Sequence, residues 1–419
     1  MIEESPATAA EPTPTPPSAA PEPAGAGAGN VPDDLIGRLR CPVTDSSVRW
    51  MSEKELDQLN AAARRSDATH LDGSPVDGRV TAALVNEAHS LAYRVEDGIL
   101  MMLPNSAVAL TRDALVRHGS AHRAEKRAVQ SFYDQIGWKR DEKGDFEDAV
   151  IWEDLRPVSA NYIRKCHLRV NRYLHPKGDY LLDVASGPVQ YPEYLTYSQG
   201  YKRRICMDIS VQALREARRK VGGWGVYILG DITNLPIRTD ALDAVISLHT
   251  IYHVPQDEQG KAFEELYRVL RPGRTGLIVY TFSDPLLLRW GNKPARWWKM
   301  ARHTAPARAI KKLLGRTPAP PADTAKKSDS ANAPFYFHAH PLSWFESRRW
   351  SFPIDIVVWR SVNVWFLSTY AHPKRLGRLL LAAIYGFEQL FPRFAGRHGP
   401  YPMFLLRKQD HRLSDPANG

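Results

Sequence analysis

The sequence predicts an α/β protein built on a parallel sheet, preceded by a small α+β unit and followed by long C-terminal insertions. Three observations lead to this fold class. From Asp179 onward, short apolar runs alternate with helical patterns, which is typical of a parallel sheet covered by helices. The first run, 180–184, leads into a turn of small residues, as a strand does before a helix. Upstream of Asp179 the pattern changes to a hairpin signal.

Composition indicates a globular protein, with 43% hydrophobic and 24% charged residues and no apolar run long enough to span a membrane. Residues 1–31 contain almost nothing to bury, so we expect a disordered tail there. The tail lacks the basic and apolar regions of a signal peptide, and the three cysteines are scattered and odd in number. We therefore expect a cytoplasmic protein without a disulfide framework.

Residues 33–104 form the small N-terminal unit. Alternation through 91–95, a turn at Asp97-Gly98 and a following apolar run predict a β hairpin. The unit opens with Arg-Cys-Pro-Val around Cys41, but Thr44 stands where a second knuckle cysteine would be, and no later pair follows. One cysteine cannot build a tetrahedral thiolate site, so we expect no metal and a packing role for the unit. Residues 107–175 carry helical patterns and are predicted to form a helical cap and linker.

The core is expected over 176–283. Its first strand ends at Asp183 and turns through Ala185, Ser186 and Gly187. Small residues belong there because a cofactor must approach the backbone where the helix N-terminus points its N–H groups. By itself, a turn with one glycine is also compatible with a strand–turn–helix that binds nothing.

Three further segments follow this turn in order. The second strand ends at Asp208, 25 residues after Asp183, where an acid can accept hydrogen bonds from ribose hydroxyls. Gly230-Asp231-Ile232 follows a third apolar run, and 242–249 reads as a fourth strand. A fifth strand is predicted at 276–280.

Together these segments resemble the motifs of class I S-adenosylmethionine-dependent methyltransferases over about a hundred residues. The resemblance implies a Rossmann-like, seven-stranded sheet with S-adenosylmethionine as cofactor. The family's first motif has three alternating glycines, of which only Gly187 is present, with Ala185 and Val189 in the outer places. The cofactor-binding residues that it implies are Asp183, Ala185, Ser186, Gly187, Asp208, Ile209, Asp231, Ile232, Ser247 and, as a lid, Tyr133.

Two features outside the core add to the resemblance. The segment 132–138 resembles the stretch that lies over the cofactor in many small-molecule methyltransferases, although Tyr133 is as compatible with a packing role. The start and end of the N-terminal unit resemble small zinc-ribbon proteins that partner and activate methyltransferases, but the zinc cysteines are missing. Such a unit would either regulate the enzyme or only pack against it.

The C-terminal third, 284–419, is implied to complete the fold with a helix at 341–350, strand six at 354–359 and an antiparallel strand seven at 402–407. It also carries insertions, including a predicted flexible loop at 317–334. This C-terminal third of the chain is basic and aromatic, with 22 Lys and Arg against 8 Asp and Glu. In this family such insertions usually build the acceptor pocket, but a solvated basic face over an aromatic core explains the composition equally well.

His249 and His253 are the candidate general bases, because they follow the fourth strand and imidazole titrates near neutrality. Their i, i+4 spacing predicts one shared helical face if the segment is helical. In the alternative interpretation, His253 caps or packs a helix and His249 only lines the pocket. No metal is expected to take part.

The expected function is methyl transfer to a hydroxyl of a small molecule, a sugar or a lipid-linked glycan. RNA methylation is the alternative activity, although the basic residues form no known RNA module, so we expect no nucleic-acid partner. An inactive cofactor-binding scaffold is the alternative of another class. Residues 372–393 begin basic and become apolar, which predicts a weak peripheral contact at the inner membrane face. A helix packed on the catalytic domain or on a second subunit fits that segment as well.

Overall fold

A computed structural model describes residues 31–118, 124–134, 138, 153–289, 336–372 and 376–410. The predicted tail, apart from Val31, and the predicted loop 317–334 lie outside these residues. Within the described part, no helix is both long enough and apolar enough to cross a membrane.

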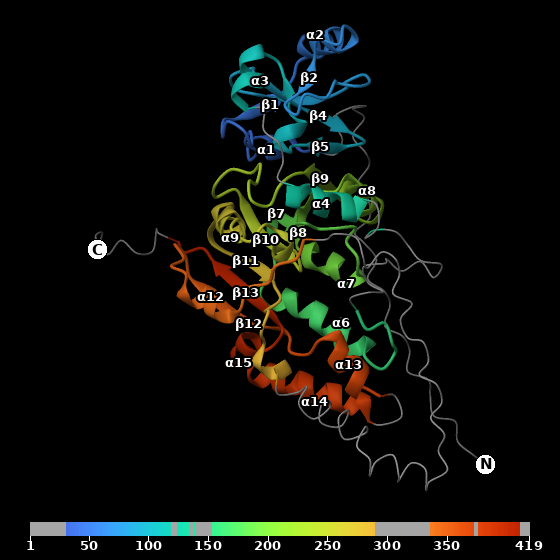
Figure 1. The fold of residues 1–419 in the computed structure, drawn as a ribbon, viewed down its shortest axis with the longest axis vertical. Helices are drawn as coiled ribbons and strands as arrows, with labels where there is room; N and C mark the ends of the chain where they lie inside the picture. Colours follow the sequence, from blue (N-terminus) through green and yellow to red (C-terminus); the bar gives the residue numbers. More distant parts are fainter. Residues whose placement is uncertain are drawn as a thin grey trace, which may run out of the picture.

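The core is a sheet in the strand order β9-β8-β7-β10-β11-β13-β12 (Figure 1). All neighbours pair in parallel except β13, which runs antiparallel between β11 and β12. This order confirms the predicted α/β class, including strands six and seven. The strands are β7 (Gly178–Val184), β8 (Tyr201–Asp208), β9 (Gly225–Leu229), β10 (Leu242–Leu248), β11 (Leu270–Val279), β12 (Ile354–Arg360) and β13 (Tyr401–Arg407).

Helices cover both faces of this sheet because its strands are apolar on both sides. Leu182 of β7 belongs to one core with Phe263 of α9, and the neighbouring Leu181 belongs to another with Leu214 of α8. The helices are α4 (Ala124–Phe132), α6 (Ala160–Leu168), α7 (Pro192–Leu195), α8 (Val211–Val221), α9 (Gln259–Arg268), α12 (Leu342–Ser347), α13 (Val364–Tyr370), α14 (Gly377–Leu390) and α15 (Pro392–His398). Short 3-10 turns occupy Arg169–Arg172, Thr196–Ser198, Gly222–Trp224 and Ile251–His253.

The N-terminal unit is joined to the core by a strand pair. The predicted hairpin is present, with Val95 opposite Leu100 and positive φ angles at Asp97 and Gly98. Its second strand, β5, pairs in parallel with β9, so one sheet runs through both parts of the chain instead of ending after seven strands. The unit comprises α1 (Asp33–Ile36), β1 (Val48–Trp50), α2 (Glu53–Arg64), β2 (Thr69–His70), β3 (Ala83–Asn86), β4 (Leu91–Glu96), β5 (Ile99–Met101), a 3-10 turn (Pro104–Ser106), β6 (Val108–Ala109) and α3 (Arg112–His118).

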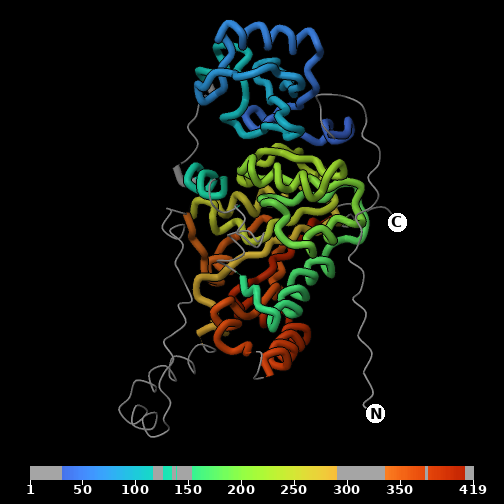
Figure 2. The backbone as a smooth tube through the Cα atoms, turned by 90° about the vertical axis from the view of Figure 1, so that its right-hand side faces the viewer, coloured from blue at the N-terminus to red at the C-terminus, as the bar shows by residue number. Residues whose placement is uncertain are grey.

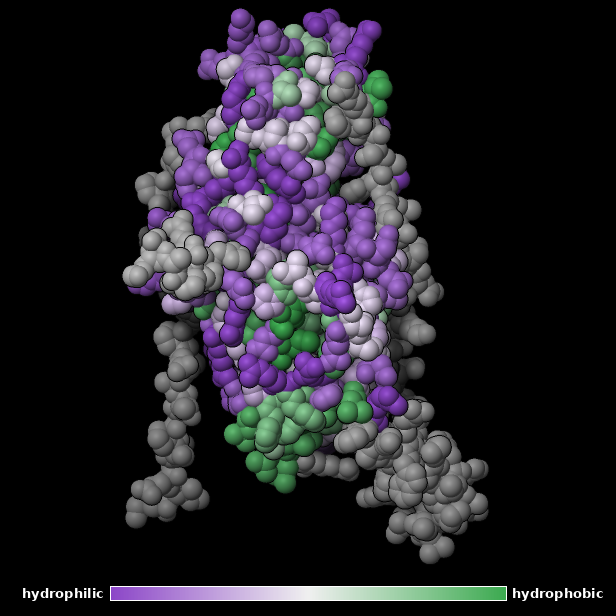
Figure 3. Space-filling model, turned by 90° about the vertical axis from the view of Figure 1, so that its left-hand side faces the viewer, coloured by the Kyte–Doolittle hydropathy of each residue, from purple (hydrophilic) through white to green (hydrophobic). Residues whose placement is uncertain are grey.

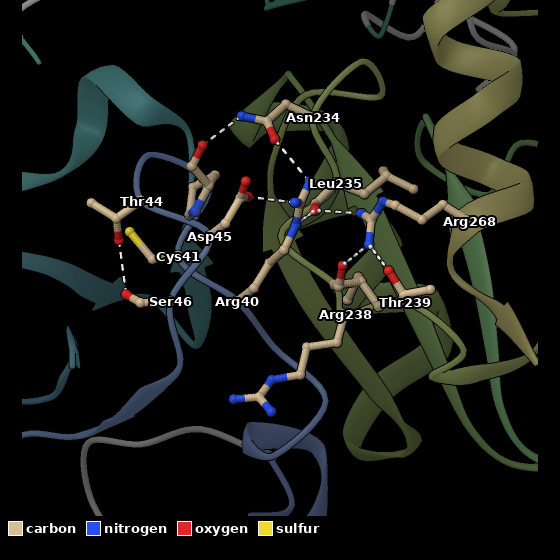
Figure 4. A network of polar contacts seen from close by, with 12 residues as sticks. Arg40, Cys41, Thr44, Asp45, Ser46, Asn234, Leu235, Arg238, Thr239 and Arg268 are labelled. Carbon is tan, nitrogen blue, oxygen red and sulfur yellow. Dashed lines mark hydrogen bonds and ion pairs between the residues drawn. The ribbon is translucent and has the colours of Figure 1, made fainter.

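Side chains reinforce the junction, as Figure 4 shows. Arg40 donates from Nη2 to Oδ1 of Asn234 (3.0 Å) and to Oε2 of Glu265 (3.1 Å), and from Nε to the Leu235 carbonyl (2.9 Å). Asn234 in turn donates to the Pro42 carbonyl (2.6 Å). The N-terminal unit therefore binds the segment that follows β9. Its contact there, Asn234, lies three residues after Asp231.

Cys41 is part of the packing of this unit. Its sulfur is buried and lies 3.1 Å from the Tyr93 hydroxyl, while Thr44 shares a hydrogen bond with Ser46 (2.8 Å). Within the described part of the chain, no three His, Cys, Asp or Glu side chains come together as a metal site would require.

Arg40→Ala is expected to lower the free energy of unfolding by about 2–3 kcal/mol, because it removes charge-assisted bonds across a mostly buried junction. Chemical denaturation measures this change. Arg65→Ala is the matched control, since the Arg65–Asp67 pair is exposed and worth less than about 1 kcal/mol. Equal effects in the two variants would show that the Arg40 contacts do not stabilise the junction.

The helices α13, α14 and α15 pack against β12 and α6 at the end of the molecule away from the N-terminal unit (Figures 1 and 2). They make up most of the described part of the predicted C-terminal insertions. The helix predicted at 341–350 is shorter in the structure, where α12 ends at Ser347.

Candidate active site

Two adjoining cavities lie at the carboxyl edge of the parallel strands, where α/β sheets bind ligands. The larger has a volume of about 290 Å³ and the smaller about 60 Å³. They share wall residues, including Ala185, Asp208 and His253. Eleven of the twelve residues predicted from the sequence line one or both: Tyr133, Asp183, Ala185, Ser186, Gly187, Asp208, Ile209, Asp231, Ile232, His249 and His253.

Ser247 is the exception. It is fully buried inside β10, and its hydroxyl has no hydrogen-bond partner among the described residues. The next two residues, Leu248 and His249, reach the larger cavity.

The turn after β7 has an unusual backbone. Ala185, Gly187 and Val189 all have positive φ angles, of 53°, 52° and 49°. These are the three places that glycine occupies in the family motif, so two non-glycine residues adopt here a conformation that favours glycine. A side chain at 187 would also come within 2.9 Å of the Trp138 ring. The turn keeps its shape without its outer glycines, at the cost of local strain.

Ala185→Gly is expected to raise the free energy of unfolding by about 0.5–1 kcal/mol, because glycine relieves a left-handed backbone at a modest entropic cost. Ala61→Gly, inside α2, is the control with the opposite sign and should lower it by about 1 kcal/mol. Thermal or chemical melting of both variants measures the difference. Destabilisation by both substitutions would contradict strain at residue 185.

Asp183 lies at the end of β7 with its side chain largely buried and pairs with Arg204 of β8. Burial raises the pKa of Asp183 above its ordinary value. Arg204 is itself fully buried and donates to the Tyr194 carbonyl (2.7 Å). The Asp183 carboxylate is thus fixed at the cavity wall by a partner that the sequence reasoning missed.

Asp208 ends β8 as predicted, and its carboxylate is already oriented by the backbone. One oxygen accepts from Gly187 N–H (2.9 Å) and the other from Ser210 N–H (2.9 Å). Burial raises the pKa of Asp208 to about 6, and the nearby Asp134 carboxylate contributes to the rise. Each oxygen keeps a second lone pair that can accept from a ligand in the cavity.

Asp231 follows β9 and lines the smaller cavity. Its carboxylate accepts from Lys126 Nζ (2.6 Å) and from the backbone N–H of Thr233 (2.9 Å). Burial opposes ionisation, but the Lys126 ammonium holds the pKa of Asp231 below its ordinary value. Lys126 also pairs with Glu258 (2.7 Å), so α4 is tied across this end of the site. Nothing in the local sequence marks Lys126.

His249 and His253 both reach the larger cavity, but the segment from 249 to 253 is not a continuous helix, so the condition for one shared helical face is not met. His249 has a left-handed backbone (φ 59°), and the 3-10 turn begins only at Ile251. Burial lowers the pKa of His249 to about 3, with the Arg360 charge adding to the effect, and burial lowers the pKa of His253 to about 4. Both imidazoles are therefore neutral at physiological pH.

An aromatic and ionic wall completes the larger cavity. Trp359 and Arg360 come from the end of β12, Tyr401 from the start of β13 and Glu153 from the segment before α6. Arg360 donates to Glu153 (2.6 Å) and lies 4.8 Å above the Tyr401 ring. The His249 ring packs edge-on against Trp359, with 4.5 Å between centroids. Sequence reasoning missed these residues, although the carboxyl-edge rule applies to strand six as well.

Tyr133 and Trp138 lie over the first turn. Their rings stack with 4.8 Å between centroids and 18° between planes, and both line the larger cavity. The Trp138 ring packs directly on Gly187, where it occupies the space that a Cβ would need. Tyr133 therefore lines the larger cavity beside this turn, with Trp138 as an aromatic partner.

Comparison with known proteins identifies the middle of the chain. Residues 182–278 match a family model described as a methyltransferase domain. Demethylmenaquinone methyltransferase of Paenarthrobacter aurescens is 29% identical over 160 residues, which are 36% of this chain and 61% of that protein. A ubiquinone/menaquinone biosynthesis C-methyltransferase of Haemophilus ducreyi is 28% identical over 116 residues, covering 26% of this chain and 44% of that protein. The chain thus spans less than two thirds of the length of either relative.

Similar solved structures are more distant. Phosphoethanolamine N-methyltransferase 2 of Haemonchus contortus has a TM-score of 0.34 at 14% identity, over 59% of this chain and 53% of that one. A Haloferax volcanii complex of the Trm112 methyltransferase activator with a methyltransferase has a TM-score of 0.35 at 11% identity, over 70% of this chain and 100% of that one. The family match includes Asp183, Asp208 and Asp231 and most of the residues that line the smaller cavity, so residues 182–278 are a methyltransferase domain whose cofactor is S-adenosylmethionine.

Proposed function

We propose that the protein transfers the methyl group of S-adenosylmethionine to a small acceptor with an aromatic ring. The observation that carries this proposal is a pair of adjoining cavities in which the residues of the cofactor motifs line the smaller cavity and one side of the larger, while aromatic rings line the rest of the larger. The two share Asp208, Ile209 and His253, so a cofactor along the side of the motifs would adjoin an acceptor on the aromatic side.

The residues present fit S-adenosylmethionine. Asp208 would accept from the two ribose hydroxyls, Asp231 and Ile232 would hold the adenine, and Asp183 would face the amino-acid end. Gly187 leaves room at the turn that a Cβ would fill. When bound, the cofactor supplies a methyl group on a sulfonium, which an acceptor nucleophile can displace in line. Ala185, Ser186 and Tyr133 would complete the enclosure.

The wall of the larger cavity favours a flat, largely apolar acceptor. Tyr191, Tyr194, Trp359 and Tyr401 contribute rings, and the buried Arg360–Glu153 pair is already bonded internally. Rings of this kind stack on aromatic ligands. The curated relatives are named for the methylation of quinone precursors, which supports the same acceptor class. The sugar or glycan hydroxyl expected from the sequence has no such support, and a phenolic hydroxyl or an activated ring carbon takes its place.

His249 is the better placed of the two histidines to receive a proton from the acceptor. It lines only the larger cavity, whereas His253 lines both and donates from Nδ1 to the Tyr336 carbonyl (3.1 Å). Neutral imidazole at 249 can take the proton of a hydroxyl while Arg360 lies nearby to favour the developing anion.

Methyl transfer from labelled S-adenosylmethionine into fractionated cell extract tests the function. We expect label in the organic-soluble, small-molecule fraction, and transfer should stop in Asp208→Asn. Label that appears in RNA instead would support the alternative activity. Tight cofactor binding by calorimetry without transfer into any fraction would support the scaffold.

A further inference from the structure

Exposed apolar side chains are concentrated on the C-terminal helices. Eight of the eleven large hydrophobic residues that are exposed in the described part of the chain lie between 365 and 394. Leu376 and Leu390 are the most exposed of these, at 74% and 76%. Figure 3 shows this group as a green cluster at the end of the molecule away from the N-terminal unit. We call it the apolar end; its members are Trp365, Leu376, Leu379, Leu380, Phe387, Leu390, Phe391 and Phe394.

The opposite face of α14 is fixed to the protein. Glu388 is fully buried, and its carboxylate accepts from Tyr162 Oη (2.7 Å), Ser361 N–H (2.7 Å) and Arg169 Nη2 (2.7 Å). Leu381 is buried on the same side. The helix therefore packs on the catalytic core through one face only, and its leucines and phenylalanines on the other face are not used for that packing. The same anchor holds Ser361, which follows Arg360 of the cavity wall.

Basic side chains outnumber acids on the helices of the apolar end, although Arg393 and Arg397 of α15 pair with Asp355 and Glu346. Glu388 is the only acid in α13, α14 and α15, and it is buried. Arg378 and Lys165 line a groove of about 310 Å³ between α6 and α14, and neither forms an ion pair with a described acid. Both side chains are exposed. A surface of exposed leucine and phenylalanine beside unneutralised cations matches the interface of a membrane that contains anionic lipid.

We propose that the apolar end docks on the surface of a bilayer containing anionic phospholipid, with the Lys165–Arg378 groove at the headgroups. A helix of 14 residues spans only about 21 Å, too short to cross the hydrocarbon core, so α14 lies along the interface. A second copy of the chain fits less well. In a twofold dimer the same patch meets itself, so these cations would face each other without an acid between them.

Docking would place the acceptor cavity close to the lipid, because Glu388 joins the outer helix to the residue after Arg360. An apolar acceptor dissolved in the bilayer would then have a short path to the site. The membrane contact itself does not rest on the proposed activity, since binding is measured without cofactor or acceptor.

Flotation of the full-length protein with lipid vesicles tests the proposal. Vesicles of phosphatidylcholine mixed with phosphatidylglycerol should carry the protein at low salt, and vesicles of phosphatidylcholine alone should carry much less. Raising the salt should release it. Absence of the protein from the floating fraction on anionic vesicles at low salt would overturn the proposal.

Two sets of variants locate the contact. Leu379→Glu combined with Leu390→Glu should lower partitioning at least tenfold, and Arg378→Gln combined with Lys165→Gln should lower it about fivefold per charge removed. Val116→Glu is the matched control, because Val116 is 85% exposed and belongs to α3, which lies at the opposite end of the molecule from α14 (Figure 1). It should float like the parent protein.

These variants leave the basic residues of 290–316 unchanged. Undiminished flotation of the Leu379→Glu, Leu390→Glu protein would therefore assign lipid binding to another part of the chain and contradict the proposal. Light scattering supplies the second readout. A dimeric parent protein that does not float and that becomes monomeric in this double variant would identify the apolar end as an interface between copies.

Discussion

Asp208→Asn is expected to weaken S-adenosylmethionine binding by about two to four orders of magnitude. Two charge-assisted hydrogen bonds to ribose, each worth about 1.5–3 kcal/mol, depend on this carboxylate. Asparagine has one acceptor oxygen, so it also cannot accept from both Gly187 N–H and Ser210 N–H. Its amide would oppose one of these donors and disturb the first turn. Calorimetric titration of the folded variant with S-adenosylmethionine measures the loss.

The pH dependence of binding provides an independent readout. The pKa of Asp208 is raised to about 6 by burial, so the carboxylate is ionised above that pH and protonated below it. Cofactor affinity should fall as the pH drops through about 6 and level off above it. Asp134→Asn is the control, because it removes a neighbouring charge without removing the acceptor. It should keep the affinity at high pH and move the midpoint lower. Unchanged affinity in Asp208→Asn would remove residue 208 from the ribose site.

The strand ends of the core could be predicted because each carries its own local signal. An apolar run that stops at an acid or a small residue marks the carboxyl end of a buried strand, and parallel strands bring these ends to one edge. That reasoning placed Asp183, Asp208 and Asp231 around the cavities. The absence of the two outer glycines did not mislead this prediction, because Ala185 and Val189 adopt the positive φ angles that glycine favours.

Contacts between distant segments could not be predicted in this way. Lys126 bonds Asp231 across 105 residues, and no spacing rule connects a lysine on an amphipathic helix to an acid on a later loop. The pairing of β5 with β9 could not be predicted for a similar reason. A short apolar strand such as Ile99–Met101 looks the same whether it ends a small sheet or continues a larger one.

The histidine pair shows a limit of a different kind. The spacing of His249 and His253 would give one shared face on a helix, but the backbone at His249 is left-handed and the 3-10 turn begins only after it. One residue with a left-handed backbone changes the direction of the chain, and with it the directions of the side chains that follow. Both rings line the same cavity. The sequence therefore predicted that the two histidines lie near each other, but it did not predict the backbone geometry that places them there.

His249→Gln is expected to lower turnover by about 10²–10⁴ while cofactor affinity stays unchanged. Glutamine keeps a polar group of similar reach but cannot take up a proton at physiological pH. His249 does not line the smaller cavity beside Asp231, so its loss should affect the acceptor more than the cofactor. His253→Gln is the matched comparison. Because His253 lines both cavities, that variant should weaken cofactor binding more than it slows turnover.

The pH dependence of turnover follows from the low pKa of His249. The pKa of His249 is lowered to about 3, so its neutral form persists down to mildly acidic pH. Turnover at saturating cofactor should therefore stay level from about pH 5 upward, with no acid limb from imidazole protonation. Single-turnover rates for the parent protein and both variants, with S-adenosylmethionine binding measured in parallel, show whether His249 contributes to the transfer. Equal turnover in the two variants and the parent would mean that positioning of the acceptor alone drives the transfer.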